Sequence, residues 1–159
     1  MKLHIVRHAQ AGKKSLWNGD DDERPLSPLG FAQSKELGKV LPKVRRLIAS
    51  PTLRCHQTLE PLAERLELEI EADDALCKTT PLNGTLTLLD DLIAAGDYVA
   101  VCCHGEVLGP LMRELEATGV TLVGGSPANQ KGSVWTVKVT KGEMLKATYR
   151  HPPHVSIKG

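Results

Sequence analysis

The chain alternates between short apolar runs and longer segments with a helical repeat. The short runs predict four strands, at residues 3–7, 46–49, 68–70 and 98–103. Apolar positions three or four residues apart predict four helices, at about residues 28–41, 51–66, 84–95 and 106–115. Two alternating segments, 134–139 and 144–149, flank Lys141-Gly142 and predict a hairpin near the end of the sequence.

Several helix ends carry residues with strong capping preferences. Ser27-Pro28 and Ser50-Pro51 each place a serine before a proline, which predicts a helix start at both sites. Asn83 is predicted to cap the third helix, and Gly96 to end it. Residues 119–132 are rich in glycine and predict a loop.

This alternation of strands and helices predicts the fold class. It indicates an α/β protein, with a three-layer α/β/α arrangement, a mainly parallel sheet and an antiparallel C-terminal edge. With 159 residues against roughly 150 per domain, the length predicts one domain over residues 1–159. Proteins of this class bind ligands beyond the carboxyl ends of their parallel strands.

Charge and composition exclude several classes of protein. Twenty Lys and Arg residues against nineteen Asp and Glu residues give a net charge of +1, which excludes a nonspecific nucleic-acid coat. Aromatic residues make up only 3%, so no nucleic acid polymer is expected as a partner. No apolar stretch approaches the roughly 20 residues that span a bilayer, so no membrane partner is expected. Four cysteines without a Cys-x-x-Cys pair fit reduced thiols, and we expect a cytoplasmic protein.

Unusual residues follow three of the predicted strands. The first strand runs into Arg7-His8, Arg54 lies at the start of the helix after the second strand, and His104 follows residues 98–103. The carboxyl ends of parallel strands share one edge, so these four side chains are expected to converge. An arginine in a first helical turn is repelled by the helix dipole unless an anion lies between them. The pattern predicts an anion site, and phosphate fits it best.

Four segments resemble motifs of the histidine phosphatase (phosphoglycerate-mutase-like) superfamily. Arg7-His8-Ala9 resembles its Arg-His-Gly signature, with alanine at the glycine position. Residues 50–58 are similar to the motif Ser-Pro-x-x-Arg-x-x-Gln-Thr, and residues 101–105 match the third motif. Residues 21–27 and Gly30 resemble the spacer of short SixA-type members. The resemblance spans residues 2 to about 150.

Two subgroups of that superfamily fit the sequence. SixA-like phosphohistidine phosphatases lack the helical lid of the mutases, and this sequence has no room for such a lid. Residues 54–63 and 130–135 are similar to the histidine-phosphatase domain fused to actinobacterial Nudix hydrolases. Whether a Nudix partner acts with this chain in trans is left open.

The resemblance implies a role for each of the four converging residues. His8 would attack phosphorus and carry the phosphoryl group, which requires a neutral imidazole. Arg7 and Arg54 would hold His8 neutral and stabilise charge on the phosphoryl oxygens. His104 would donate to the same oxygens. Neither a cofactor nor a metal is expected.

The motifs do not identify a general acid that would protonate the leaving group. Residues 75–79, where mutase-like enzymes usually have a glutamate, contain none. Glu106 and Asp21 are the two candidates, although a helix N-terminal carboxylate for Glu106 and a solvated loop for Asp21 are the better explanations of each residue. Arg24 either contacts substrate or pairs with the neighbouring acidic residues.

These observations predict a metal-independent phosphatase that acts through a phosphohistidine on His8. A missing acid suits a leaving group that departs without a dedicated proton donor. The first expected substrate is a protein phosphohistidine, such as a phosphorylated histidine phosphotransfer domain. A nucleotide or other small phosphate is the alternative substrate. A different class of function is a catalytically silent module that recognises phosphate.

Overall fold

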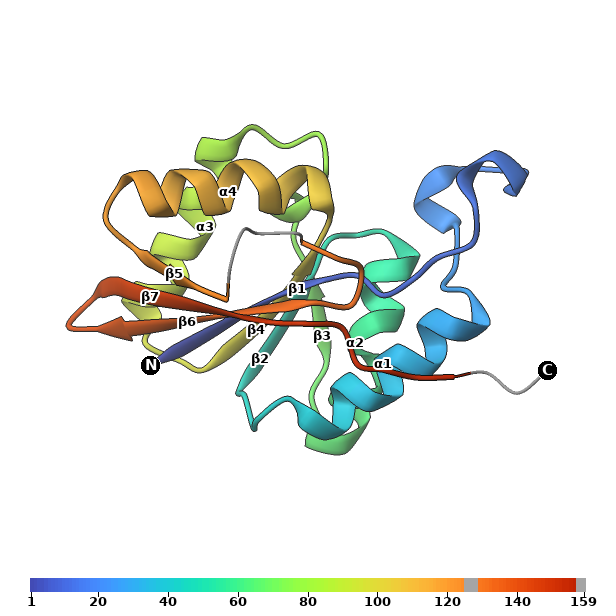
Figure 1. Ribbon diagram of the computed structural model, residues 1–159, viewed down its shortest axis with the longest axis horizontal. Coiled ribbons are helices and arrows are strands. Elements are labelled where there is room, and N and C mark those ends of the chain that lie inside the picture. The colour runs from blue at the N-terminus through green and yellow to red at the C-terminus, as the bar shows by residue number, and fades with distance from the viewer. Residues whose placement is uncertain (125–128, 157–159) are drawn as a thin grey trace.

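The computed structural model describes residues 1–124 and 129–156, which form a three-layer arrangement of helices and strands (Figure 1). The strands are β1 (Lys2–Arg7), β2 (Arg46–Ala49), β3 (Ile70–Ala72), β4 (Val99–Cys103), β5 (Thr121–Val123), β6 (Val134–Thr140) and β7 (Glu143–Arg150). The longer helices are α1 (Pro28–Val40), α2 (Leu53–Leu66), α3 (Leu82–Ala95) and α4 (Gly105–Ala117). Among the described residues, no helix is long and apolar enough to cross a bilayer.

Three short 3₁₀ helices interrupt the connections between these elements. They are η1 (Lys14–Leu16), η2 (Asp21–Glu23) and η3 (Asp74–Leu76). The first two lie in the long segment between β1 and α1, whose ends are joined by a bridge between Ala11 and Leu26. That segment projects from the body of the molecule at the upper right of Figure 1.

The strands form one sheet in the order β3-β2-β4-β1-β6-β7-β5. The first four are parallel neighbours, whereas β6 is antiparallel to both β1 and β7. The predicted α/β class, with a mainly parallel sheet and an antiparallel C-terminal part, is confirmed. One strand was missed: β5 lies inside the predicted loop 119–132, pairs parallel with β7 and forms the edge. Three residues are too few to show a period in the sequence.

Both faces of the sheet are covered, which explains the unbroken apolar run in β4. Val99, Val101 and Cys103 pack toward α3 and α4, in one hydrophobic cluster. Ala100 and Cys102 pack toward α1 and α2, in a second cluster. The prediction that this strand is buried on both faces is confirmed.

Two helix starts illustrate where capping predictions succeed and fail. Ser27 caps α1 as predicted, because its Oγ accepts a hydrogen bond from the backbone N–H of Gly30 at 3.1 Å. The prediction for Asn83 is wrong, since this residue lies within α3, which begins at Leu82. The preceding residue is Pro81, whose ring fixes φ at a value that leads directly into a helix.

The predicted cap at Ser50-Pro51 is also wrong. Helix α2 begins at Leu53, and its N-cap residue is Thr52. The Oγ of Ser50 instead lies 2.9 Å from Nε2 of His104. The backbone N–H of Ser50 donates to the carbonyl of Cys102 at 3.0 Å. Both contacts tie the serine to the end of β4, so it is not free to cap a helix.

Candidate active site

Residues that follow neighbouring parallel strands meet at the carboxyl edge of the sheet. Arg7 ends β1 opposite Cys103, the last residue of β4, so His8 and His104 leave the sheet side by side. The centroids of the two imidazole rings are 5.4 Å apart, and their planes lie at 65°. The charges of Arg7 and Arg54 both act on His8. The structure therefore brings the four predicted side chains together.

The backbone fixes the orientation of His8. Its Nδ1–H donates to the carbonyl of Ala9 at 2.7 Å, so Nε2 of the neutral ring carries the free lone pair. The N–H of Ala9 donates to Oγ1 of Thr58 at 3.0 Å. The Thr58 hydroxyl donates to the carbonyl of Arg54 at 2.7 Å. Thr58 therefore links the chain after His8 to the helical turn that carries Arg54.

Helix α1 also holds the segment that follows His8. A Cβ built on Gly30 would lie only 1.8 Å from the carbonyl oxygen of Gln10, so no larger residue fits at this position. The backbone N–H of Ser27 donates to that carbonyl at 3.0 Å. The N–H of Gln10 donates to Oε1 of Gln33 at 2.9 Å. The close approach at Gly30 thus fixes the chain two residues after the imidazole.

The surroundings of His8 favour its neutral form. Burial is the largest cause and, with the charges of His104, Arg54 and Arg7, lowers the pKa of His8 from 6.5 to about 3. The hydrogen bond to Ala9 acts in the opposite direction and is smaller than the effect of burial. From the sequence, the neutral ring was expected to result from the two arginines alone. The structure ranks burial above them, because the histidine is only 5% exposed.

Arg7 lies against the first residue of α4. Its Nη1 donates to the carbonyl of Asn129 at 2.6 Å. A Cβ on Gly105 would lie 2.9 Å from Cζ of Arg7, so a larger residue there would displace the guanidinium. The buried Nε of Arg7 has no hydrogen-bond partner among the described residues. This donor is unsatisfied in the absence of a ligand.

Arg54 is almost completely buried, at 2% exposure. Its Nη1 donates to the carbonyl of Asp21 at 2.6 Å, and its Nη2 donates to the carboxylate of Asp21 at 3.1 Å. Its Nε lacks a partner within the described parts of the chain. Unsatisfied buried donors are costly, so the two orphaned guanidinium N–H groups are consistent with an anion site.

Asp21 is the centre of a cluster of cations. Its Oδ2 accepts from Nζ of Lys78 at 2.6 Å and from Arg54, and its Oδ1 accepts from Nε of Arg24 at 3.0 Å. The hydrogen bond from Lys78, followed by those from the arginines, holds the pKa of Asp21 well below its usual range. Asp21 is therefore ionised near neutral pH. Three cations share this one carboxylate.

Lys131 is a further cation close to the arginines of this site. Burial, and after it the charges of Arg7, Arg24 and Arg54, lower the pKa of Lys131. Lys131 forms no ion pair within the described residues. Neither Lys78 nor Lys131 was predicted as a site residue, because neither directly follows a predicted strand, although Lys131 lies in segment 130–135 and Lys78 in segment 75–79.

His104 is positioned by the second motif. Its Nε2 lies 2.9 Å from Oγ of Ser50 and 3.7 Å from Sγ of Cys55. Its other ring nitrogen, Nδ1, is therefore the one available to a ligand. The described residues hold no group of three or more His, Cys, Asp or Glu side chains placed to bind a metal ion.

The two candidate acids lie in different settings. Asp21 touches Arg54, but its lowered pKa favours the carboxylate over the acid. Glu106 is exposed in the first turn of α4 and forms no hydrogen bond with the described residues. Arg24 pairs with Asp21, and its Nη1 also donates to the carbonyl of Gly12.

Comparison with known proteins adds to this geometry. Residues 3–79 match the family model of the histidine phosphatase superfamily (branch 1). An 8-oxo-(d)GTP phosphatase of Mycolicibacterium smegmatis is 31% identical over 154 residues, which cover 94% of this chain and 48% of that protein. This chain thus spans about half the length of that relative.

Solved structures give the same fold. The protein histidine phosphatase SixA, solved with tungstate, matches with a TM-score of 0.75 and 26% identity over 95% of both chains. A mycobacterial glucosyl-3-phosphoglycerate phosphatase matches with a TM-score of 0.65 and 16% identity, over 86% of this chain and 89% of that one.

An α/β sheet that presents two histidines and two arginines at its carboxyl edge defines a class of phosphate-handling proteins. Residues 3–79 place this chain's first half among matches to the histidine phosphatase superfamily, and its whole fold resembles that of the protein histidine phosphatase SixA.

Proposed function

We propose that the protein is a metal-independent phosphatase that works through a covalent phosphohistidine on His8. The observation that carries this proposal is the state of that ring. It is neutral, its Nδ1–H donates to the Ala9 carbonyl, which leaves the lone pair on Nε2, and the charges of Arg7 and Arg54 act on the ring. A protein that only binds phosphate gains nothing from a nucleophile held in this way.

The reaction would proceed in two transfers. In the first, Nε2 of His8 attacks phosphorus, the bond from phosphorus to the leaving group breaks, and the leaving group takes a proton. Arg7 and Arg54 stabilise the charge on the phosphoryl oxygens, and His104 donates to them from Nδ1. In the second, water attacks the phosphohistidine, which releases phosphate and restores His8.

The cations around Asp21 favour a substrate with more than one phosphate. Arg7 and Arg54 suffice for the transferred phosphoryl group. Arg24, Lys78 and Lys131 are then left to bind further phosphate groups. Within the described residues, Asp21 is the only carboxylate that pairs with any of the three. We therefore favour a phosphoanhydride such as a nucleoside di- or triphosphate, whose leaving group is itself a phosphate. Such a leaving group departs without a strong general acid, and the relative named for 8-oxo-(d)GTP supports this class.

Protein phosphohistidine is the second candidate substrate. It is supported by the likeness to SixA, which extends over 95% of both chains and therefore leaves no room for a large lid. Its leaving imidazole also departs without a strong acid.

A substrate panel separates these candidates. We expect kcat/KM for a nucleoside triphosphate to exceed that for a phosphorylated histidine phosphotransfer domain and for a sugar phosphate by about tenfold or more, which is the effect of roughly 1.4 kcal/mol of added phosphate binding. Lys131→Gln should reduce turnover of the triphosphate by about tenfold but that of para-nitrophenyl phosphate by less than about threefold. Preference for the phosphorylated protein, with equal losses in Lys131→Gln, would instead support the SixA-like activity.

The pH dependence tests the neutral state of His8. For an imidazole with an ordinary pKa of 6.5, the neutral fraction would fall about 25-fold between pH 7 and pH 5. Because the pKa of His8 is about 3, we expect its neutral fraction to stay near complete down to pH 5. An NMR titration of the His8 ring, with the burst of para-nitrophenol release measured in parallel, checks this. A midpoint near 6.5 in both measurements would contradict it.

A further inference from the structure

A second basic surface lies on the sheet away from the catalytic residues. The register of β1, β6 and β7 places Lys2 opposite Lys138, and Lys138 opposite Lys146. A neighbouring row across the same strands consists of His4, Thr136 and Thr148. Leu3 and Ile5 pack toward α3 and α4, so alternation along β1 turns the two rows to the opposite face.

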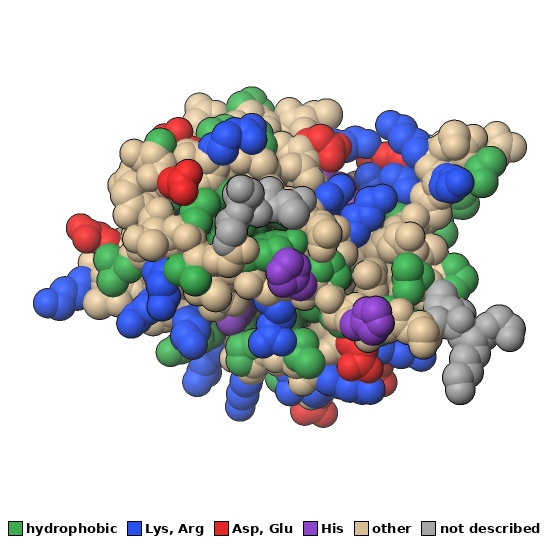
Figure 2. Space-filling view, in the orientation of Figure 1, with side chains coloured by type: hydrophobic (Ala, Val, Ile, Leu, Met, Phe, Trp, Pro, Cys, Tyr) green, Lys and Arg blue, Asp and Glu red, His purple; other side chains and the backbone are tan. Residues whose placement is uncertain are grey.

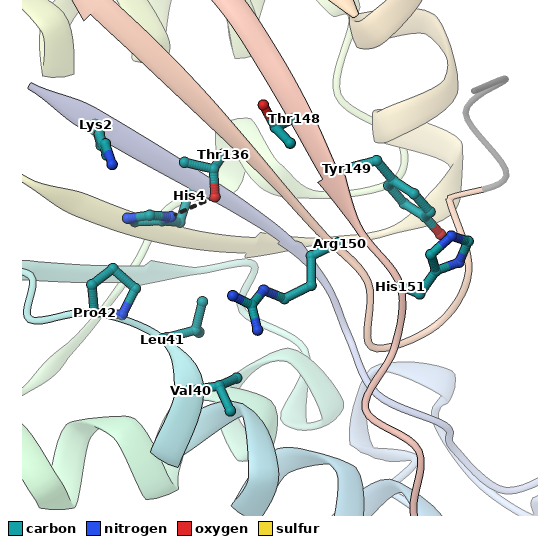
Figure 3. Close-up of a pocket in the computed structure, with 10 residues that line it drawn as sticks. All are labelled: Lys2, His4, Val40, Leu41, Pro42, Thr136, Thr148, Tyr149, Arg150 and His151. Carbon is teal, nitrogen blue, oxygen red and sulfur yellow. Dashed lines mark hydrogen bonds between the residues drawn. The ribbon is translucent and has the colours of Figure 1, made fainter. Parts of the chain in front are cut away.

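This face is hollowed beside the end of α1. A cavity of about 590 Å³ lies there, and Figure 3 shows Lys2, His4 and Arg150 on its strand side, with Val40, Leu41 and Pro42 across from them. None of the residues that line it is acidic. None of the catalytic side chains lines it either. His4 lies within β1 and His8 follows the last residue of that strand, so four residues separate them, a distance of about 13 Å along an extended chain.

The positive charges on this face are uncompensated. Lysines directly opposite one another on neighbouring strands repel, so the row Lys2, Lys138 and Lys146 destabilises the sheet. Neither these lysines nor Arg150 forms an ion pair within the parts of the chain that the structure describes. Figure 2 shows Lys and Arg side chains gathered along the lower edge of the molecule, beneath the β6–β7 hairpin. An anionic ligand would offset this repulsion.

His4 adds an unsatisfied polar group to the wall of the cavity. The residue is 2% exposed, and its Nδ1 lies 2.9 Å from Oγ1 of Thr136. Its Nε2 has no hydrogen-bond partner among the described residues. Burial, then the charges of Lys2 and Arg150, lower the pKa of His4 to about 4, so the ring is neutral. With Nδ1 accepting from the Thr136 hydroxyl, Nε2–H is a donor.

We propose that this cavity binds a small phosphate-bearing anion at a site separate from the catalytic centre. Lys2 and Arg150 supply charge, and Thr148 supplies a hydroxyl, which are groups that recognise phosphate oxygens. The volume lies within the range of pockets that hold small molecules. A concave cavity with this positive charge favours a small anion over a flat protein surface. The proposal does not depend on the substrate of the catalytic site.

The test is an NMR titration of the whole chain, with backbone amide shifts as the readout. Methylenediphosphonate, an analogue of diphosphate whose P–C–P link is not hydrolysed, is the first probe. Inorganic phosphate and AMP are parallel probes that separate a diphosphate from a single phosphate group. We expect amides of residues 2–4, 136 and 148–150 to shift together, with one dissociation constant. The double variant Lys2→Gln/Arg150→Gln should raise that constant at least tenfold and leave shifts near His8 unchanged.

A control variant and an alternative ligand complete the experiment. The variant Lys43→Gln/Arg45→Gln removes the same charge from a different cavity and should bind as the wild type does. Hexaglutamate tests an acidic protein segment as the alternative occupant. The proposal is overturned if all three phosphate probes shift only amides at the catalytic edge, if both double variants weaken binding equally, or if only hexaglutamate binds the cavity.

Discussion

Replacing His8 with alanine is expected to reduce kcat by about 10⁴-fold or more, the order of loss found when a covalent nucleophile is removed. The reason is geometric. The hydrogen bond from Nδ1–H of His8 to the Ala9 carbonyl leaves the free lone pair on Nε2 of His8. In His104, Nε2 instead forms a hydrogen bond with Ser50. With Nε2 of His104 accepting from Ser50, its Nδ1 carries the proton and offers no lone pair, so this ring does not replace His8. The rate is measured with para-nitrophenyl phosphate, and the covalent intermediate is trapped with ³²P-labelled substrate at alkaline pH.

The control for this experiment is His154→Ala, which removes an exposed histidine from the C-terminal segment. We expect this variant to keep full activity and a normal phosphoenzyme. A labelled phosphoenzyme that persists in His8→Ala would place the nucleophile elsewhere. Equal background rates in the wild type and in His8→Ala would instead support the catalytically silent module that recognises phosphate.

The place of the site is predictable from the sequence because it depends on local features. The apolar runs that form β1 and β4 are visible without any knowledge of the fold, and their ends lead directly to His8 and His104. Parallel pairing of the two strands then brings these residues to one edge. Arg54 follows from the same rule, since it lies in the first turn of α2, the helix that follows β2.

Contacts between distant segments are not predictable in this way. Ser50 satisfies every local rule for a helix cap, yet its hydroxyl lies against His104, which is 54 residues away. Lys78 reaches Asp21 across 57 residues, and no pattern in the sequence connects them. The strength of burial at His8 likewise depends on packing that only the folded chain defines.

The charge on Asp21 bears on the missing general acid. A proton donor needs a raised pKa, whereas Lys78, Arg24 and Arg54 hold this carboxylate ionised. The structure therefore favours Asp21 as a group that orients these cations when no ligand is bound. An incoming phosphate would compete with its carboxylate for Nη2 of Arg54.

Arg54→Lys is expected to reduce kcat by about 10²- to 10³-fold, the loss typical when one preorganised donor to a transition state is removed. The substitution keeps the positive charge but removes the planar guanidinium and its unpartnered Nε. A single ammonium cannot contact the Asp21 carbonyl and two phosphoryl oxygens in the same geometry. The measurement is kcat for para-nitrophenyl phosphate together with the melting temperature, because Arg54 is buried.

Arg46→Lys is the matched control, since Arg46, like Arg54, makes a two-point contact with one acidic residue, through Nε and Nη2 to the Glu71 carboxylate, but lies on the surface. It should lose little activity, because an exposed ion pair contributes at most about 1 kcal/mol to stability. If Arg54→Lys melts like the wild type and keeps full kcat, charge alone suffices at this position and the guanidinium geometry is irrelevant. If its kcat falls while its melting temperature holds, the orphaned donor acts in the transition state rather than in folding.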